Sequence, residues 1–205
     1  AEKAALAAAL ATELTAMVQP EAPKDKPNEK PAPHPKHSIK IRNVILQLLS
    51  LVGTEAEVAA ITGCMSDYEL REYARMALEK IPCKASAEAL IKRLEKATGP
   101  EFRIGVVNTL AKFGCPMSIE AIRKMAGDSD ACVRAAVVDA LAKAADPAND
   151  NVIESMVKAG QVCPVHVSKA RLRLAENLAG KGNKTAAKKI YAIVAADKKN
   201  AAQAK

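Results

Sequence analysis

The stretch VRAAVVDALAKAA at residues 133–145 is one copy of a pattern that recurs along the chain. Three other segments align with it without gaps: IRNVILQLLSLVG (41–53), LREYARMALEKIP (70–82) and FRIGVVNTLAKFG (102–114). A fifth copy, ARLRLAENLAGKG (170–182), keeps the same two key positions. Every copy has an arginine in its second position, namely Arg42, Arg71, Arg103, Arg134 and Arg171. Every copy also has a leucine seven residues later, namely Leu49, Leu78, Leu110, Leu141 and Leu178.

The spacing of these copies indicates a two-helix repeat. The steps from arginine to arginine are 29, 32, 31 and 37 residues, which is the length of a repeat built from two short helices. Between the copies lie stretches that we expect to form the partner helices, at 54–66, 84–97, 116–126 and 148–159. One helix pair cannot bury its own apolar face, so neighbouring pairs stack to form a continuous core. The sequence therefore predicts an all-α fold, a right-handed α-α superhelix of about five helix pairs.

The composition agrees with closely packed helices. Hydrophobic residues make up 49% of the chain, but aromatic residues only 2%, and there is no tryptophan. A pocket for a flat aromatic cofactor is usually lined with aromatic side chains. We therefore expect no cofactor.

The ends of the chain differ from the repeats. Residues 1–18 are rich in alanine and place Leu6, Leu10, Leu14 and Met17 at helical spacing, which predicts an amphipathic helix that docks on another element. Residues 19–38 contain six prolines, and this density predicts an extended linker, with a proline-rich ligand for an adaptor domain as the alternative. The solenoid is expected over 39–182, followed at 183–205 by a capping helix and a basic tail.

No apolar run is long enough to cross a membrane, and no signal peptide is visible. The sequence does not begin with methionine, so we expect either a processed product or a fragment of a longer protein.

The five cysteines indicate neither a zinc site nor a complete disulfide framework. No two of them form a CxxC pair, and their number is odd. We interpret them as small hydrophobic residues at helix ends and on buried faces.

The stretch from Asp128 to Leu141, DSDACVRAAVVDAL, resembles the pattern of HEAT repeats, and the resemblance extends over about residues 39–180. In that family the aspartate of the turn and the arginine of the next helix commonly form a ladder between repeats. The resemblance assigns these roles to Asp128, Asp130 and Arg134, while the other four arginines match the pattern at the arginine alone. We call the five arginines the arginine column and expect it to join the repeats through hydrogen bonds to turn carbonyls and aspartates, with a positive stripe on one concave face as the alternative. At the other turns Ser66-Asp67 is a partial match, and Thr98-Gly99-Pro100 has no aspartate.

The C-terminal residues 170–197 look like a tetratricopeptide-type helix pair, through Leu178, Gly182, Ala186, Ala187 and Tyr191. The combination is similar to the armadillo-like and HEAT-like regions of large secreted bacterial proteins. This similarity slightly favours an extracytoplasmic (periplasmic or secreted) setting.

The sequence shows no convincing catalytic constellation. His34 and His37 lie in the proline-rich segment, where two ligands without a fixed third rarely hold a metal. His166 stands three residues after Cys163, so a Cys–His dyad is the one nucleophilic arrangement to consider. A di-iron hydroxylase of this fold needs repeated His–Glu pairs, and a DNA glycosylase needs aromatic residues around a flipped base; neither is present. A lyase of the bilin-lyase type has no short motif to test and stays open as an alternative.

Positive charge is concentrated at the C-terminal end. The net charge is +8 and the pI is about 9.3. Residues 165–205 hold ten basic against two acidic side chains, and the rest of the chain is balanced. We expect a basic contact surface at Lys181, Lys184, Lys188 and Lys189, with a solubilising tail as the alternative. Aromatic residues are scarce there, so any binding to nucleic acid would be through the phosphates and sensitive to salt.

The sequence therefore predicts a non-enzymatic scaffold that binds another protein through the surface of its repeats, most naturally the concave face. The alternatives are binding of nucleic acid or an acidic partner through the basic end, and an enzyme built on a HEAT frame. We expect the chain to act as a monomer or as part of a larger chain.

Overall fold

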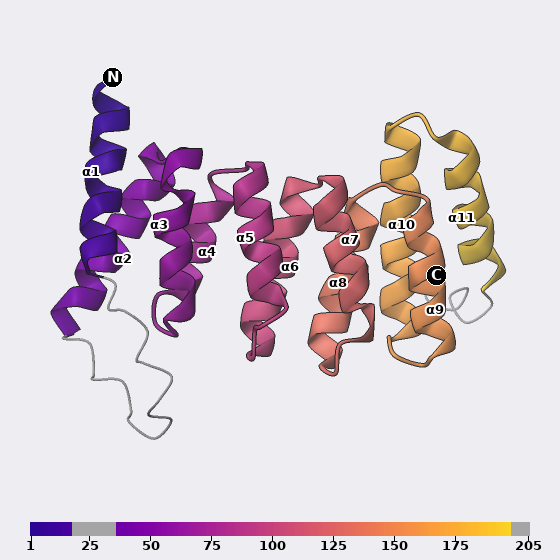
Figure 1. Ribbon diagram of the computed structural model, residues 1–205. Helices are drawn as coiled ribbons and strands as arrows, with labels where there is room; N and C mark the ends of the chain where they lie inside the picture. The colour runs from indigo at the N-terminus through magenta and orange to yellow at the C-terminus, as the bar shows by residue number, and fades with distance from the viewer. Residues whose placement is uncertain (18–35, 198–205) are drawn as a thin grey trace. The chain divides into compact units, whose positions relative to one another are not determined.

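The computed structural model describes residues 1–17 and 36–197. These residues form eleven α-helices and three short 3-10 helices, with no strand among them (Figure 1). The α-helices are α1 (Glu2–Ala16), α2 (Lys36–Val52), α3 (Val58–Gly63), α4 (Arg71–Glu79), α5 (Lys84–Leu94), α6 (Pro100–Phe113), α7 (Pro116–Lys124), α8 (Ala131–Lys143), α9 (Ala148–Lys158), α10 (Pro164–Gly180) and α11 (Lys184–Ala196). The 3-10 helices are η1 (Glu55–Glu57), η2 (Cys64–Ser66) and η3 (Met125–Gly127). The prediction of an all-α fold is confirmed.

From α2 onward the helices alternate as the repeat spacing predicts. The arginine-and-leucine segments lie on α2, α4, α6, α8 and α10, and each is followed in the chain by its partner, α3, α5, α7, α9 or α11. The chain divides into two compact units, residues 1–93 and 94–205, so that the boundary falls inside the segment 39–182 expected to form the solenoid.

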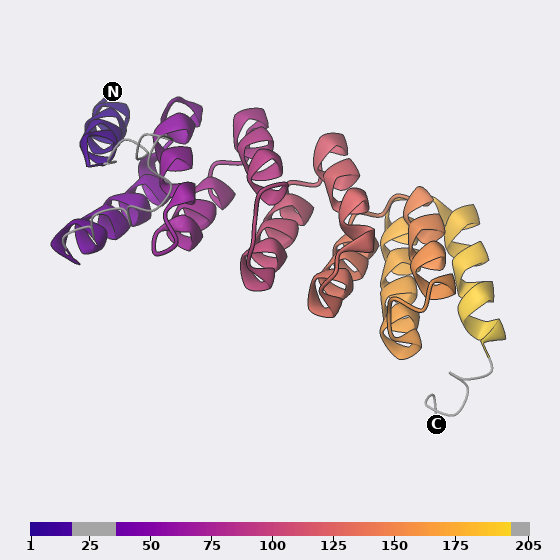
Figure 2. The ribbon, with the colours of Figure 1, turned by 60° about the horizontal axis from the view of Figure 1, so that its bottom comes forward.

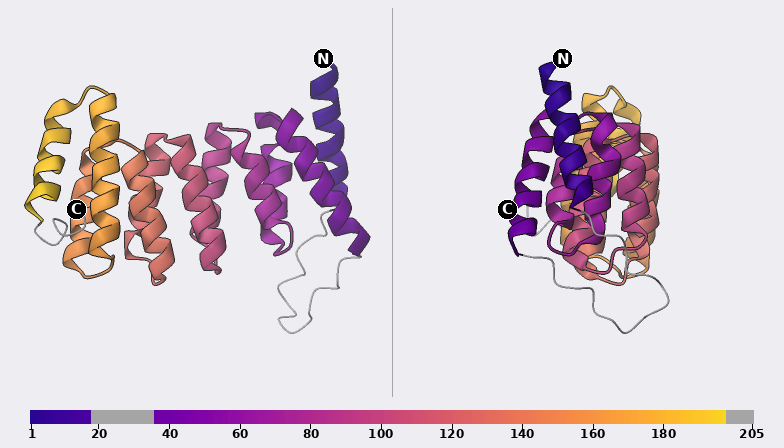
Figure 3. Two further views of the ribbon diagram at one scale, coloured as in Figure 1. Left: turned by 180° about the vertical axis from the view of Figure 1, so that it is seen from behind. Right: turned by 60° about the vertical axis from the view of Figure 1, so that its left-hand side comes forward.

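In the first unit, α2 packs on α4, and α3 packs on α4 beside it. The N-terminal helix α1 lies against α2 and α3 (Figure 3). It buries Ala7 and Leu14, which are seven residues apart, while Leu6 is 50% exposed. The buried strip of α1 is therefore narrower than the four-residue stripe that the sequence suggested.

The second unit shows why the fold is a solenoid. The helix α6 packs on α8, and α8 packs on α10, so each contacts the next but one along the chain. The intervening helices α7 and α9 pack on α8, and α11 packs on α10 (Figure 2). This alternation is the contact pattern of stacked helix pairs, in which each repeat touches mainly its neighbour.

The leucines of the repeat form the core. Leu49, Leu78, Leu110 and Leu141 are 0% exposed, and Leu178 is 1% exposed. In α8 the alanines Ala140 and Ala142 beside Leu141 are also fully buried, which lets the neighbouring helices approach closely. The face that the sequence expected to be buried is buried in all five copies.

Local sequence signals set where the helices of the second unit begin and end. Pro100, Pro116 and Pro164 occupy the first position of α6, α7 and α10, where the missing N–H costs little. Gly114 ends α6 with a φ of 61°, a left-handed conformation that glycine adopts without strain. These residues fix where the helices begin and end, and so help to set the spacing between successive arginines.

Most of the expected proline-rich linker at 19–38 lies outside the described residues, and so does His34. The helix α2 begins at Lys36, directly after the last proline, so residues 36–38 are helical. The C-terminal helix expected after residue 182 is α11, and the basic tail after Asp197 lies outside the described residues. None of the described helices is both long and apolar enough to span a membrane.

Candidate functional site

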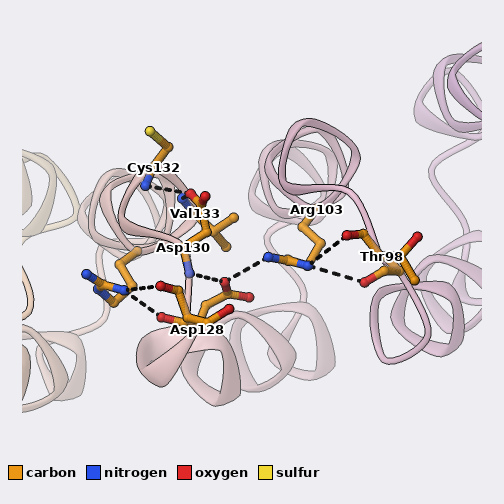
Figure 4. Close-up of polar contacts among 9 residues, drawn as sticks. Thr98, Arg103, Asp128, Asp130, Cys132 and Val133 are labelled. Carbon is orange, nitrogen blue, oxygen red and sulfur yellow. Dashed lines mark hydrogen bonds and ion pairs between the residues drawn. The ribbon is translucent and has the colours of Figure 1, made fainter.

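The polar centre of the second unit is the turn between η3 and α8. Here Arg103 of α6 donates from Nη2 to Asp128 Oδ1 at 3.0 Å (Figure 4). Its Nη1 donates to the carbonyls of Ala97 and Thr98 at 3.4 and 3.5 Å. Arg103 therefore connects the turn that precedes its own helix to the turn of the next repeat.

The two aspartates of this turn have separate tasks. Asp128 also accepts from the backbone N–H of Asp130 at 2.8 Å, which folds the turn around its carboxylate. Asp130 is the N-cap of α8 and accepts from the N–H groups of Cys132 and Val133 at 2.8 and 3.1 Å (Figure 4). A capping carboxylate satisfies helix donors that would otherwise lack partners.

Arg134 repeats the geometry of Arg103 one helix pair further on. Its Nη1 donates to the carbonyls of Asp128 and Ser129 at 2.7 and 2.9 Å, in the turn before α8. Its Nε donates to the carbonyl of Gln161 at 2.9 Å, in the turn after α9. Both arginines thus bridge consecutive turns, although the forward acceptor is a carboxylate in one case and a backbone carbonyl in the other.

In the first unit Arg42 makes the corresponding contact. Its Nη1 lies 3.3 Å from Asp67 Oδ2. Asp67 follows Arg42 by 25 residues, the same spacing that separates Asp128 from Arg103. The Arg42 side chain is 2% exposed and also contacts the Cys64 sulfur at 3.7 Å. Burial raises the pKa of the Cys64 thiol, and Arg42 opposes that rise only in part. The turn Ser66-Asp67, which matches the HEAT pattern only in part, therefore still provides the aspartate that pairs with the arginine of the preceding helix segment.

Two members of the arginine column are used differently. Arg71 is the first residue of α4, and its guanidinium lies over the ring of Tyr68, 4.3 Å from the centroid. Arg171 lies in the second turn of α10 and pairs with Asp150 at 2.8 Å and with Glu154, both on α9. It therefore ties α10 to the helix before it, instead of reaching the following turn.

A second polar network was not foreseen from the sequence. Arg123 of α7 pairs with Asp146 and donates to Asn149 Oδ1 at 2.7 Å. Asn149 is fully buried and donates in turn to the carbonyl of Leu141 at 2.8 Å. A signal exists in the spacing, because Arg123 precedes Asn149 by 26 residues, close to the 25 residues that separate Arg103 from Asp128. It was missed because Arg123 lies on a partner helix, outside the aligned segments.

We call the surface at Lys181, Lys184, Lys188 and Lys189 the basic end. It belongs to the last helix pair of the second unit, α10 and α11 (Figure 2). Ala187 and Ile190 bury one face of α11. On its other faces Lys184, Lys188 and Lys189 are exposed, and none of them has an ion pair with another described residue. Lys181 is also exposed and donates to the carbonyl of Ala144 at 3.2 Å.

Large apolar side chains are exposed on the same two helices, and on α11 Tyr191 and Ile193 follow Lys188 and Lys189 by three and four residues, at neighbouring positions of the helix surface. Leu172 of α10 is 39% exposed, and Tyr191 and Ile193 of α11 are 39% and 42% exposed. The helix α11 therefore presents exposed cations and exposed apolar side chains at neighbouring positions.

The suggested Cys163–His166 dyad is not the arrangement that the structure favours. Cys163 is the exposed N-cap of α10, whereas His166 Nε2 is directed at α8. The Nε2 atom of His166 lies 3.3 Å from the carbonyl oxygen of Ala135 and 3.4 Å from Asp139 Oδ1. His166 therefore connects α10 to α8. Within residues 1–17 and 36–197 no three His, Cys, Asp or Glu side chains are grouped so as to hold a metal.

The cysteines only partly follow the expectation that they lie at helix ends and on buried faces. Cys64 is buried, and Cys83 and Cys115 are half-buried directly before α5 and α7, each with its sulfur near the serine three residues later, at 3.3 and 3.0 Å. Cys132 and Cys163 lie at the starts of α8 and α10 but are exposed. The helix-end placement is therefore right, and burial is wrong for these two.

Comparison with known protein families gives one match in this region. Residues 87–162, from within α5 to the turn after α9, match the family model described as HEAT repeats. The matched stretch contains Arg103, Asp128 and Arg134, the residues that bridge its turns. No curated protein matches the chain.

Proposed function

We propose that this chain, a HEAT-repeat protein by its match over residues 87–162, is a non-enzymatic scaffold that binds an acidic region of another protein through its basic end. HEAT repeats commonly serve as protein-interaction scaffolds. The observation that carries the proposal is the division of the positive charges. Four of the five arginines, Arg42, Arg103, Arg134 and Arg171, are engaged in holding helices and turns together, while the lysines of the basic end are left exposed.

The arginines of the column stabilise the packing of the helices and do not take part in the proposed contact with a partner protein. Arg103, Arg134 and Arg171 each bond to groups within the second unit, and their side chains are at most half-exposed. Guanidinium groups that are already bonded to carboxylates and carbonyls offer few donors to a ligand. We therefore assign these residues to keeping the helix pairs in a fixed geometry.

The basic end supports the contact. Lys184 and Lys188 are four residues apart and so share a face of α11, with Lys189 beside them. Exposed cations of this kind speed the encounter with an acidic surface and select against basic ones. Tyr191 and Ile193, at neighbouring positions of α11, supply apolar area that a folded or helical partner can cover.

A protein partner fits this surface better than a nucleic acid does. Proteins that bind single strands stack bases on aromatic side chains, and Tyr191 is the one aromatic residue between 114 and 205. Lysines without such platforms bind phosphates with little sequence preference. The exposed aliphatic side chains have no role in that mode.

The test uses the full chain as bait for affinity capture from nuclease-treated extracts of the source cells, followed by titration calorimetry with the purified partner. We expect a protein that stays bound after nuclease treatment and binds in a fixed ratio. The matched variants are Lys184→Glu/Lys188→Glu/Lys189→Glu at the basic end and Lys96→Glu/Lys124→Glu/Lys143→Glu at three other exposed lysines.

The first variant should bind the partner roughly 30-fold more weakly, because three exposed ion pairs contribute about 2 kcal/mol together. The second should bind within a few-fold of the wild type. Retention of nucleic acid alone, lost after nuclease treatment, would favour the nucleic-acid alternative. Equal losses in both variants would refute a localised contact at the basic end.

A further inference from the structure

We propose that the outer face of α2 is the seam of a homodimer, in which α2 packs antiparallel against α2 of a second copy. The face consists of Ile41, Val44, Leu48 and Leu51, which are 49%, 53%, 41% and 70% exposed. We call these four residues the α2 stripe. The adjoining face of the same helix, with Ile45, Leu46 and Leu49, is buried in the first unit. The apolar surface of α2 is thus wider than the part that it buries, and no residue within 1–17 and 36–197 covers the α2 stripe.

The spacing of the α2 stripe is that of a helix-pairing seam. Its members follow one another at intervals of three, four and three residues, as the a and d positions of a heptad do. Single exposed aliphatic residues are ordinary, but four in a continuous line are not. This pattern selects a helix as the element that covers the stripe.

The groups beside the stripe are polar but uncharged. Asn43, Gln47 and Ser50 flank it, and they bond among themselves, with Gln47 Nε2 donating to Asn43 Oδ1 at 3.1 Å. Between residues 39 and 52 the only charged residues are Lys40 and Arg42, and Arg42 is buried in its contact with Asp67. A strongly charged partner would find no complement here, whereas a second copy of the same neutral seam would.

An antiparallel arrangement makes the stripe complementary to itself. In this register Ile41 faces Leu51 of the second copy, and Val44 faces Leu48, so all four layers are filled. Lys40 then lies beside the C-terminal end of the opposing α2, where a cation interacts favourably with the helix dipole. A parallel pairing would instead bring the two Lys40 ammonium groups together.

The distribution of charge over the chain permits this association. Residues 1–93 hold 13 basic and 12 acidic side chains, a net charge of +1, whereas residues 94–205 hold 18 and 11, a net charge of +7. Two first units therefore meet with almost no electrostatic repulsion. Four half-exposed side chains from each copy form a seam smaller than the ~1,600 Å² of a standard interface, so we expect dissociation in the micromolar range.

Sedimentation equilibrium of the full chain tests the proposal. We expect the weight-average mass to rise from the monomer toward the dimer as the concentration passes through the micromolar range. Leu51→Glu, at the most exposed position of the stripe, should remain monomeric with an unchanged helical circular dichroism spectrum. Met76→Glu, at a residue of α4 with an exposed fraction of 54% against 53% for Val44, should dimerise like the wild type.

A mixing experiment tests the orientation. Ile41→Lys and Leu51→Glu should each be monomeric alone but form a mixed dimer when combined, because only the antiparallel register places the introduced lysine of one variant opposite the introduced glutamate of the other. A wild-type chain that stays monomeric at all concentrations, or a Leu51→Glu variant that dimerises as the wild type does, would overturn the proposal. A mixture that remains monomeric would overturn the antiparallel register.

Discussion

At the scale of single residues, Asp128 joins two repeats through both its side chain and its backbone. Its carboxylate accepts from Arg103 and from the N–H of Asp130, and its backbone carbonyl accepts from Arg134. The Asp128 and Arg103 side chains are only 8% and 14% exposed. An ion pair in such a position matters mainly because removal of one partner leaves the other without compensation.

Replacement of Asp128 by alanine should therefore lower the free energy of unfolding by about 3 kcal/mol, as measured by urea denaturation. The matched control is Asp139→Ala, whose carboxylate is 40% exposed and lies 3.4 Å from His166. That change should cost less than about 1 kcal/mol. Equal effects of the two substitutions would mean that the turn at Asp128 does not hold the repeats together.

Glu154 makes the stability of the second unit depend on pH in the acidic range. The hydrogen bond and charge of Arg171 hold the pKa of the Glu154 carboxyl below its usual range. A carboxyl whose pKa is lower in the folded than in the unfolded chain stabilises the fold at neutral pH, and this contribution is lost as the pH falls through the folded-state value. The sensitive range therefore lies below the ordinary glutamate pKa of about 4.3.

Glu154→Gln should be less stable than the wild type at pH 7, and the difference should shrink as the pH falls below about 4. Urea denaturation at a series of pH values measures it. Glu176→Gln, at an exposed position of α10, is the control and should follow the wild type at every pH. A constant difference for Glu154→Gln at all pH values would show that the pair with Arg171 does not stabilise the fold.

At the scale of elements, the arginine-bearing helices are held by their leucine faces. Leu141 of α8 is fully buried between neighbouring helices, whereas Leu172 of α10 is 39% exposed on the basic end. The burial of an aliphatic side chain contributes through both its transfer from water and the absence of a cavity.

Leu141→Ala should lower the free energy of unfolding by about 2–5 kcal/mol, because the space it leaves cannot close fully. Leu172→Ala, the same chemical change on the surface, should cost less than about 1 kcal/mol. Chemical denaturation followed by circular dichroism measures both. A small loss for Leu141→Ala would contradict a core built on the repeated leucines.

The same elements show what a sequence can and cannot predict. The recurrence of Arg and Leu was sufficient for the all-α repeat fold, because periodic apolar residues specify which face of a helix is buried. The partners of Arg171 were not predictable from the repeat alone. Because α10 begins seven residues before it, Arg171 lies in the second turn and meets Asp150 and Glu154 of α9.

The ladder of turns was predictable only where the aspartate motif is complete. The sequence assigned an inter-repeat role to Asp128 and Asp130 alike, but only Asp128 bonds to Arg103, whereas Asp130 caps its own helix α8. The role of Asp67 emerged from its distance to Arg42 in the fold. The network of Arg123, Asp146 and Asn149 lies on partner helices, whose sequences do not align with one another. The lysines of the basic end were evident from charge alone, but the exposure of their helix neighbours Tyr191 and Ile193 was known only once the buried face of α11 was known.

At the scale of the molecule, two surfaces of different chemistry stand out among the residues that the structure describes. One is the neutral α2 stripe in the first unit, and the other is the basic end of the second unit. Because their chemistry differs, we propose different partners for them, a second copy of the chain for the α2 stripe and an acidic protein for the basic end. A dimer formed through α2 would present two basic ends, so a partner with two acidic sites would bind it with higher avidity than a monomer.

Hydrogen–deuterium exchange of the full chain, alone and with its captured partner, tests whether the partner binds at the basic end without changing the packing of the other helices. We expect the partner to slow amide exchange in α11 and in the exposed turns of α10, while exchange in α6 and α8 stays unchanged. Exchange that slows equally in α6 and α8, or that does not change in α11, would contradict a preformed frame with its contact at the basic end.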